Sequence, residues 1–500
     1  MPAVNDQSTQ YSPTMGLLYI FNLIVGTGAL ALPKAFQTAG YALSILVLLI
    51  SCSVSYIAAT FVVESLSVGN AVHVRKRRQE VEPASEFDDV VITESGPSSF
   101  EINEKIEVSQ MALMFLGRGG VIFSYLALDI YLFGDLAIYS TTVSKSMMNM
   151  ICATVNTSTV LSADPCRESW PLIFDRFTVY RLCVILFVMV CTPMVIIGIT
   201  KTKYLQLATT LSRWSAFTLM ILLASAQMMA NGAATIPPAA NIHGFGSLFG
   251  VAVYAFMCHH SIPSLVTPMS SKSGVFGKLF CVYLLVLCFY FTLSLTGSFA
   301  FAHVQDVYTL NFLHDDYTSV FYFFCDHFLA LFPVFTLTTN YPIVGITLIN
   351  NVRVLWDLVA PAAESVASEQ ESLLEDEEEH DTRTRRANRP LEASKAGLVL
   401  VSDVVIPVLV IGLPTIISLL TDDVLMLATI TGSYPGVGVQ FLIPCLLVMR
   451  ARTYAKGVLN FPVPKKFASP FQSKYWPYAI FLWAAFAIAM ATVNTLGVRF

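Results

Sequence analysis

Two interruptions of long apolar runs are the places where this chain could do chemistry. The first is Val25-Gly26-Thr27-Gly28 inside the run 13–37, and the second is Phe256-Met257-Cys258-His259 inside the run 245–269. In the hydrocarbon of a bilayer, backbone groups freed by a break have no water to bond, so a break is tolerated where protein or a polar cavity receives them. Such cavities hold substrates and ions, and the sequence therefore predicts a ligand site at the two breaks.

The first break offers both signs of partial charge. A helix that ends near Val25 presents the carbonyl oxygens of Leu23, Ile24 and Val25, which suit a cation such as sodium. A helix that restarts after Gly28 presents N–H groups that suit a carboxylate, and glycine permits close backbone approach. At the second break, the carbonyls of Phe256 and Met257 could take an ammonium group. The predicted substrate-binding residues are Gly26, Thr27, Gly28, Tyr254, Phe256 and Met257.

The aromatic side chains of the second break have two interpretations. Tyr254 and Phe256 could form a gate over a substrate, or they could pack between helices. Aromatic residues make up 12% of this chain, and packing is their commoner role. Pro263, shortly after the break, suits the first turn of a restarted helix, where its missing N–H costs little.

Ionisable residues inside apolar runs are functional candidates, because an unpaired charge in hydrocarbon is costly. Asp135 and Arg213 lie near the middle of their runs, so a buried ion pair is one interpretation. The other makes a carboxylate a proton acceptor, since burial favours the neutral form. Arg213 would oppose this at Asp135, which leaves Asp326 or Asp129 better placed.

A histidine pair lies at the second break. Imidazole changes its charge near neutral pH, so His259, which His260 follows, could couple transport to protons or gate it by protonation. The alternative is a histidine whose hydrogen bonds are all made inside a polar cavity.

Composition fixes the class of protein. Apolar residues make up 55% of the chain and charged residues 13%, and apolar runs of about 20 residues recur throughout. We therefore predict an all-α polytopic membrane protein of eleven helices. Their expected ranges are 13–37, 41–66, 119–147, 177–200, 204–230, 245–269, 278–303, 317–349, 397–420, 424–449 and 475–496.

Lysine and arginine gather in every second gap between these runs, which predicts that those gaps and residues 1–12 are cytosolic and that the C-terminus is luminal or extracellular. The gap 148–176 then lies on the luminal or outer side. It holds a glycosylation sequon at Asn156 and two of the ten cysteines, Cys152 and Cys166, for which a disulfide is expected.

Two long gaps on the cytosolic side, 68–118 and 352–396, have mixed or acidic charge, and we interpret both as mostly disordered. Glu369, Leu373 and Leu374 fit an acidic dileucine sorting signal that a clathrin adaptor could bind, although an acidic segment can match this loose pattern by chance. A lysosomal or endosomal membrane and the plasma membrane both remain open.

The two breaks carry a resemblance to a known family. Asn22 to Gly28 with Pro33, and Tyr254 to His259, are similar to the amino acid/auxin permease family of the amino acid, polyamine and organocation transporter superfamily. A narrower resemblance, to the transmembrane protein 104 family, rests on residues 21–30 and on Gly134 to Tyr139, Lys201 to Gln206 and Phe332 to Thr336.

This resemblance implies two inverted five-helix repeats, 13–230 and 245–449, with discontinuous helices 1 and 6, and an added helix at 475–496. It also implies transport of a small neutral amino acid coupled to sodium or protons, with no other cofactor. A sodium ion would be held by Ile24, Thr338 and Thr339, and Asn22 could reach it. Asn22 and the threonines could instead bond neighbouring helices or their own backbone.

Two other function classes are an enzyme and a sensor. The sequence has no HExxH run, no Walker loop and no CxxC pair, so we expect that the protein is not an enzyme. The long cytosolic gaps keep open a transporter-like amino acid sensor or trafficking scaffold, which would bind but not move its ligand. The expected partners are a small molecule and membrane lipid, and no nucleic acid.

Overall fold

The structure is a computed structural model of the whole chain. It describes residues 10–81, 97–152, 164–167, 170–171, 173–198, 203–313, 319–359 and 404–496. Asn156 and the sorting residues Glu369, Leu373 and Leu374 lie outside these ranges, so their roles stay predictions.

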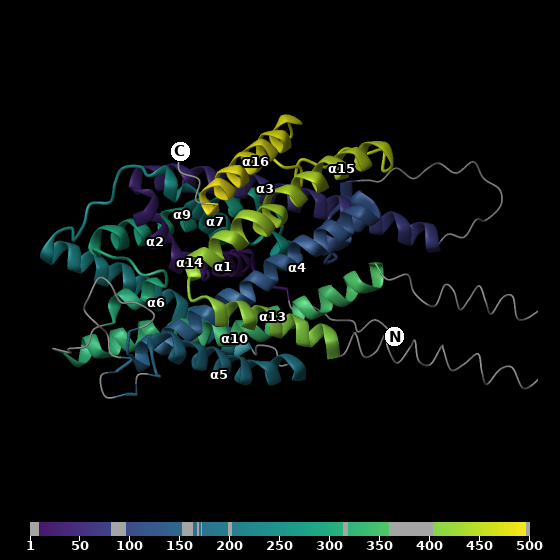
Figure 1. Cartoon of the computed structure of the whole chain (residues 1–500). Coiled ribbons are helices and arrows are strands. Elements are labelled where there is room, and N and C mark those ends of the chain that lie inside the picture. The colour runs from purple at the N-terminus through teal and green to yellow at the C-terminus, as the bar shows by residue number, and fades with distance from the viewer. Residues whose placement is uncertain are drawn as a thin grey trace, which may run out of the picture.

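The described chain is helical almost throughout (Figure 1). The α-helices are α1 (Pro13–Ile24), α2 (Gly28–Ala39), α3 (Tyr41–Val81), α4 (Val108–Ile151), α5 (Arg176–Ile197), α6 (Lys203–Asn231), α7 (Phe245–Ala255), α8 (Ile262–Val266), α9 (Val275–Ala300), α10 (Val320–Val359), α13 (Ile406–Leu420), α14 (Val424–Thr431), α15 (Ile443–Gly457) and α16 (Tyr475–Thr495). Short 3₁₀ turns are η1 (Pro97–Phe100), η2 (Ile242–Gly244), η3 (His259–Ser261) and η4 (Tyr308–Phe312), and two π-helical turns are η6 (Gly432–Gly436) and η7 (Gly438–Leu442).

The predicted all-α membrane class is confirmed. Within the described ranges, eight helices are long and apolar enough to cross a bilayer, and the bent pair α1 and α2 makes up to nine. Each of the eleven predicted runs contains a helix among the described residues, but α6 and the short α13 do not meet the same criterion. The count of eleven spans and the inverted repeat therefore stay predictions.

Both predicted breaks are present. The axis bends by 52° between α1 and α2, and residues Val25 to Thr27 belong to neither helix. The chain also leaves α7 at Ala255 and restarts through η3 into α8, where Pro263 occupies the first turn, as its missing N–H allows.

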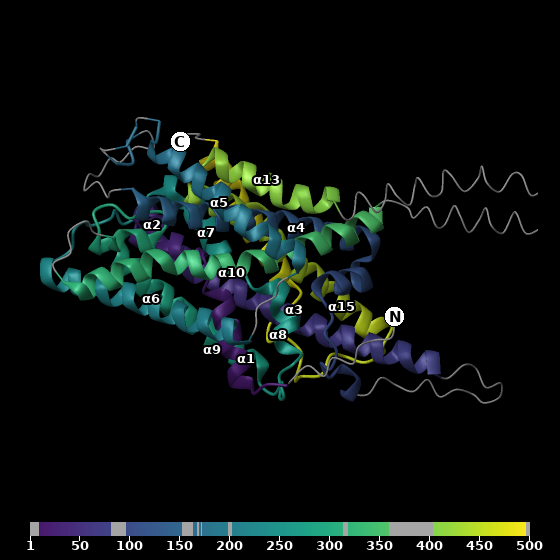
Figure 2. The ribbon, with the colours of Figure 1, turned by 90° about the horizontal axis from the view of Figure 1, so that it is seen from below.

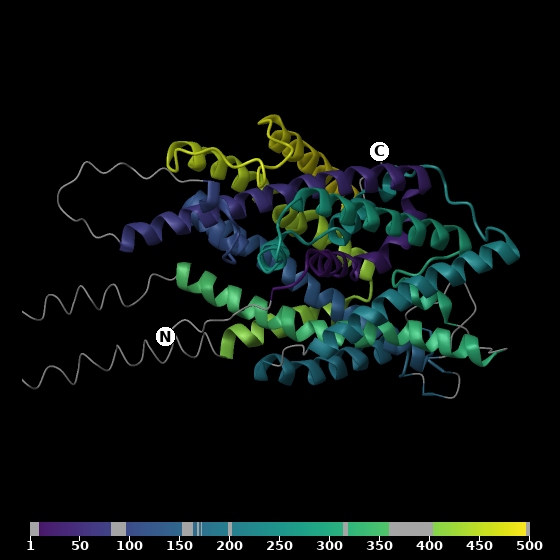
Figure 3. The same cartoon turned by 180° about the vertical axis from the view of Figure 1, so that it is seen from behind.

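The broken helices lie in the middle of the bundle. In Figures 1 and 3, α1 and α7 lie between one layer with α5, α10 and α13 and another with α3, α15 and α16. Glycines let α7 approach its neighbours closely: a Cβ at Gly28 of α2 would lie 2.6 Å from the Ala255 Cα, and one at Gly432 would lie 1.9 Å from the Gly250 carbonyl oxygen. The helix α7 is therefore packed between α2 and the start of η6.

The expected disorder of the gap 68–118 is wrong for much of it. The helix α3 continues to Val81, and α4 begins at Val108 with a kink at Gly117. Between them, Phe100, Ile102 and Ile106 are fully buried. Polar contacts hold this segment to α3, because Glu104 pairs with Arg77 at 2.6 Å and with His73 at 3.0 Å.

Contacts tie the helices together at both ends of the bundle. At the end where the segment 97–107 lies, here called the loop end, Arg452 of α15 binds both carboxylate oxygens of Glu64 of α3 at 2.8 Å. At the opposite end, which carries Cys152 and Cys166 and is here called the disulfide end, Lys145 of α4 donates to Asp306 at 2.8 Å and to the Asp422 carbonyl at 2.9 Å.

Candidate functional site

The two breaks meet, and hydroxyl groups join them. The Thr27 and Tyr254 hydroxyls are 2.9 Å apart, so a hydrogen bond links the first break to the last turn of α7. The Tyr290 hydroxyl of α9 lies 2.9 Å from the carbonyl oxygen of Ile24 and 2.9 Å from that of Ala255. One buried tyrosine therefore contacts the ends of both α1 and α7.

Backbone groups of both signs are left without partners at this junction. The N–H of Thr27, just before α2, donates to no group in the described chain, and the carbonyls of Phe256 and Met257 accept no hydrogen bond there. Gly26 and Thr27 are only half-buried, although Val25 is 1% exposed. The junction therefore presents backbone donors and acceptors that the described residues do not pair.

Arg213 of α6 lies at the end of α1. Its guanidinium donates to the Asn22 carbonyl. The Asn22 side chain is held by the same helix, since its Oδ1 accepts from Trp214 Nε1 at 3.1 Å and its Nδ2 donates to Thr210 at 3.4 Å. A fixed cation therefore contacts the negative end of the α1 dipole, where the sequence predicts a metal cation.

The buried ion pair considered for Asp135 and Arg213 does not form. Both residues lie in the described chain, and Arg213 bonds Asn22 instead. Tyr139, one turn from Asp135 on α4, has both charged groups as neighbours. Asp135 is 6% exposed and faces the Tyr254 hydroxyl, while its Oδ1 has no hydrogen-bond partner among the described residues. A buried carboxylate with one oxygen that no described residue bonds therefore lies beside the junction.

The other ionisable candidates lie elsewhere. Asp129 is buried about 120° around α4 from Asp135, and its side chain faces Asn351 of α10. Asp326 is buried on α10. His259 is 0% exposed, and its Nε2 contacts the Ser55 carbonyl of α3 at 2.9 Å.

Two of the three groups expected to bind sodium have partners inside the protein. Thr339 donates to the Thr336 carbonyl of its own helix at 2.9 Å, and the Ile24 carbonyl accepts from Tyr290. Thr338, on the same helix, is half-buried. The second-break aromatics differ, since Phe256 packs fully buried between Tyr283 and Tyr290, whereas Tyr254 bonds Thr27.

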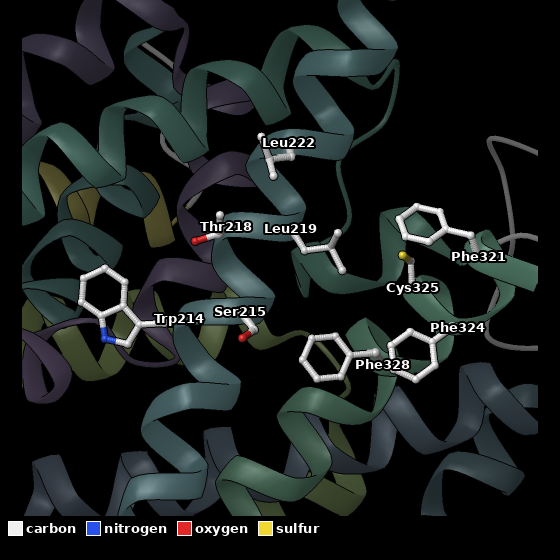
Figure 4. A pocket seen from close by; sticks show the side chains of 9 residues that line it. All are labelled: Trp214, Ser215, Thr218, Leu219, Leu222, Phe321, Phe324, Cys325 and Phe328. Carbon is white, nitrogen blue, oxygen red and sulfur yellow. The ribbon is translucent and has the colours of Figure 1, made fainter.

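A separate cavity of about 630 Å³ lies between α6 and α10, which run side by side (Figure 2). In Figure 4, Leu219 of α6 points toward Phe321, Phe324, Cys325 and Phe328 of α10, whereas Trp214 and Thr218 extend to the other side of α6. Phe324 is 67% exposed, so the cavity opens on the outer surface of the bundle. It touches the junction only through Trp214, which stacks on Phe21 of α1.

Comparison with known proteins decides the family. The family model described as transmembrane amino acid transporter protein matches residues 9–488. The chain belongs to this transporter family. Within it, the chain belongs to the transmembrane protein 104 family, because it is 60% identical to the Transmembrane protein 104 homolog of Caenorhabditis elegans over 506 residues, covering 100% of both chains. It is also 35% identical to Transmembrane protein 104 of Homo sapiens over 524 residues, covering 99% of this chain and 98% of the other.

Among solved structures, the crystal structure of MhsT in complex with L-phenylalanine is similar to this member of the transporter family. The TM-score is 0.46 with 13% sequence identity, and the match covers 97% of this chain and 99% of that chain.

Sequence reasoning missed three features of this transporter-family site: the contact of Arg213 with α1, the role of Tyr290, and the bond between Thr27 and Tyr254. Tyr290 gave no signal, because it lies in an ordinary aromatic run on α9. The structure also joins Cys152 and Cys166 in a disulfide.

Proposed function

We propose that this protein is a secondary active transporter that moves a small neutral amino acid across a membrane by alternating access, coupled to protons. The observation that carries the proposal is the junction of the two breaks, which the Thr27–Tyr254 hydrogen bond joins and where the Thr27 N–H and the carbonyls of Phe256 and Met257 have no described partner. A zwitterion needs this combination, because its carboxylate takes donors and its ammonium takes acceptors.

The position of the zwitterion follows from the helix ends. Its carboxylate binds at the start of α2, next to Gly26 and Thr27, where the helix dipole is positive. Its ammonium binds the carbonyls of Phe256 and Met257. Tyr254, held by Thr27, closes one side of the site. The volume left for the substrate side chain decides which amino acid fits.

Two contacts favour protons over sodium. Arg213 already supplies a positive charge at the end of α1, so a sodium ion there would meet an adjacent cation. Asp135, by contrast, is a buried carboxylate whose Oδ1 has no partner within the described ranges, and it needs a proton to be neutral. We assign the coupling proton to Asp135.

Alternating access requires the two ends to open in turn. The pair Glu64–Arg452 holds the loop end, and the pair Lys145–Asp306 holds the disulfide end. Each pair joins different elements, so each must separate when its own end opens.

Counterflow tests the proposal. Purified protein in liposomes that are preloaded with a mixture of unlabelled neutral amino acids should take up the labelled compounds transiently above equilibrium. Saturable binding without counterflow would instead establish the sensor alternative. A thermal shift by the same compounds reports binding in both cases, because a ligand that binds only the folded state stabilises it.

A further inference from the structure

A second group of buried polar atoms belongs to His259, His260 and Gln440. These atoms have no hydrogen-bond partner among the described residues. From this group we infer that Tyr131, His260 and His259 form a relay that carries the coupling proton between Asp135 and the loop end of the bundle. The inference rests on the proposed function and extends it, because it assigns the path that the proton takes.

The contact with Ser55 determines which ring nitrogen of His259 carries a hydrogen. A backbone carbonyl can only accept, so the Nε2 of His259 carries a hydrogen and donates it to the Ser55 oxygen at 2.9 Å. In a neutral imidazole the other nitrogen then carries only a lone pair. This Nδ1 is buried, and no described residue donates to it. His259 therefore presents a base in the protein interior.

Gln440 of η7 adds a second unpaired acceptor on the same side. Its amide nitrogen donates to the Ser55 hydroxyl, while its Oε1 is buried without a described donor. The turns η3 and η7 pack against each other and against α3, which brings these groups together. Two buried acceptors need donors, and water or an extra proton supplies them where protein does not.

Tyr131 connects this group to Asp135. It lies one turn from Asp135 on the same face of α4, and its ring centroid is 6.0 Å from that of His260 and 6.1 Å from that of Tyr254. The Nδ1 of His260 is also buried and has no described partner. The Tyr131 hydroxyl can accept one proton and release another. His259, whose Nε2 hydrogen stays on the Ser55 carbonyl, takes up and releases the proton at Nδ1, so a complete transfer leaves every group with its original charge.

The surroundings of the relay contain few other titratable groups. Cys258 precedes the histidines and contacts Tyr283 of α9 at 3.2 Å. Asp135 and Tyr139 of α4 also lie near Tyr131. Ser55 and Gln440, from α3 and η7, carry no titratable group. Asp135 is therefore the carboxylate that Tyr131 faces, and it forms one end of the row.

The test compares two readouts in liposomes that contain the full-length protein. Uptake of labelled neutral amino acids driven by a pH gradient requires net proton movement, whereas exchange of labelled for unlabelled substrate at equal pH does not. A pH-sensitive dye inside the liposomes measures the proton flux directly. The variants are His259→Gln, which keeps a donor for the Ser55 carbonyl, and His260→Gln, with His243→Gln in the exposed η2 turn as the matched control.

We expect gradient-driven uptake and proton flux to fall at least about tenfold relative to exchange in both relay variants. The control should keep the wild-type ratio. An unchanged ratio in the two relay variants overturns the inference while the transporter stands. Wild-type protein that shows no exchange at all overturns the proposed function, and the relay with it.

Discussion

The guanidinium of Arg213 donates a hydrogen bond to the carbonyl of Asn22 and so places a permanent positive charge at the end of α1. The Asn22 side chain is bonded by Trp214 and Thr210 of the same helix α6. The broken helix is therefore fixed to α6 by contacts to one residue, three positions before the break.

Removing this charge should impair transport. Arg213→Met leaves the Asn22 carbonyl unpaired in the interior, which costs about 1–3 kcal/mol, so uptake should fall about tenfold or more. Arg213→Lys keeps the charge and should retain more activity than Arg213→Met. Initial uptake rates of purified protein measure this, with exposed Arg450→Met as control. Wild-type rates in Arg213→Met would remove Arg213 from the mechanism.

Substitutions of the two glycines of the first break should have different effects. A Cβ at Gly26 has no atom closer than 4.0 Å, whereas one at Gly28 would lie 2.6 Å from the Ala255 Cα. Gly26→Ala therefore folds normally but puts a methyl group into the substrate space, and affinity should fall about tenfold to 100-fold. Gly28→Ala forces the broken helices apart and should cost about 1–3 kcal/mol of stability.

Thermal melts and substrate titrations of both glycine variants check this difference. Equal loss of stability in Gly26→Ala and Gly28→Ala would show that the two glycines are equally closely packed. Normal substrate affinity in Gly26→Ala would place the ligand elsewhere.

The hydroxyl of Tyr290 should contribute to both stability and transport. Tyr290→Phe removes the donor for the carbonyls of Ile24 and Ala255 while keeping the ring, at a cost of about 1 kcal/mol or more. Tyr308→Phe is the matched control, because the buried Tyr308 hydroxyl has no described partner. We expect melting temperature and uptake to fall in the first variant and not in the second. The reverse order would refute the assignment.

The disulfide of the loop after α4 should contribute to stability. Cys152 and Cys166 close a loop of sequence separation 14, for which the loss of chain entropy predicts about 3 kcal/mol. Reducing agent should lower the melting temperature of the wild type and leave a Cys152→Ser, Cys166→Ser double variant unchanged. Alkylation followed by mass spectrometry shows whether the two thiols are free; free thiols in native protein would contradict the structure.

The breaks could be predicted because their cause is local. Glycines at 26 and 28 weaken a helix, and an apolar run on both sides leaves no alternative to a break inside the bilayer. The sequence also places Thr27 and Tyr254 at the two breaks, although it does not show that their hydroxyls touch. Both breaks appear within a few residues of their expected places.

The partner of Arg213 could not be predicted, because it is a backbone carbonyl 191 positions away. Depth in the membrane made Asp135 the apparent partner, but Tyr139 lies near both groups and the pair does not form. The order of residues 97–107 was missed for a related reason. Their charges resemble a solvated loop, yet Glu104 pairs with two residues of α3 and the apolar side chains between are buried.

The most direct test of proton-coupled transport is uptake of labelled neutral amino acids by the purified protein in liposomes, with a sodium gradient and a pH gradient imposed separately. Accumulation should follow the pH gradient, persist without sodium, and lose its pH dependence in Asp135→Asn. Accumulation that requires sodium, with the same pH profile in wild type and Asp135→Asn, would contradict the assignment of Asp135 and Arg213.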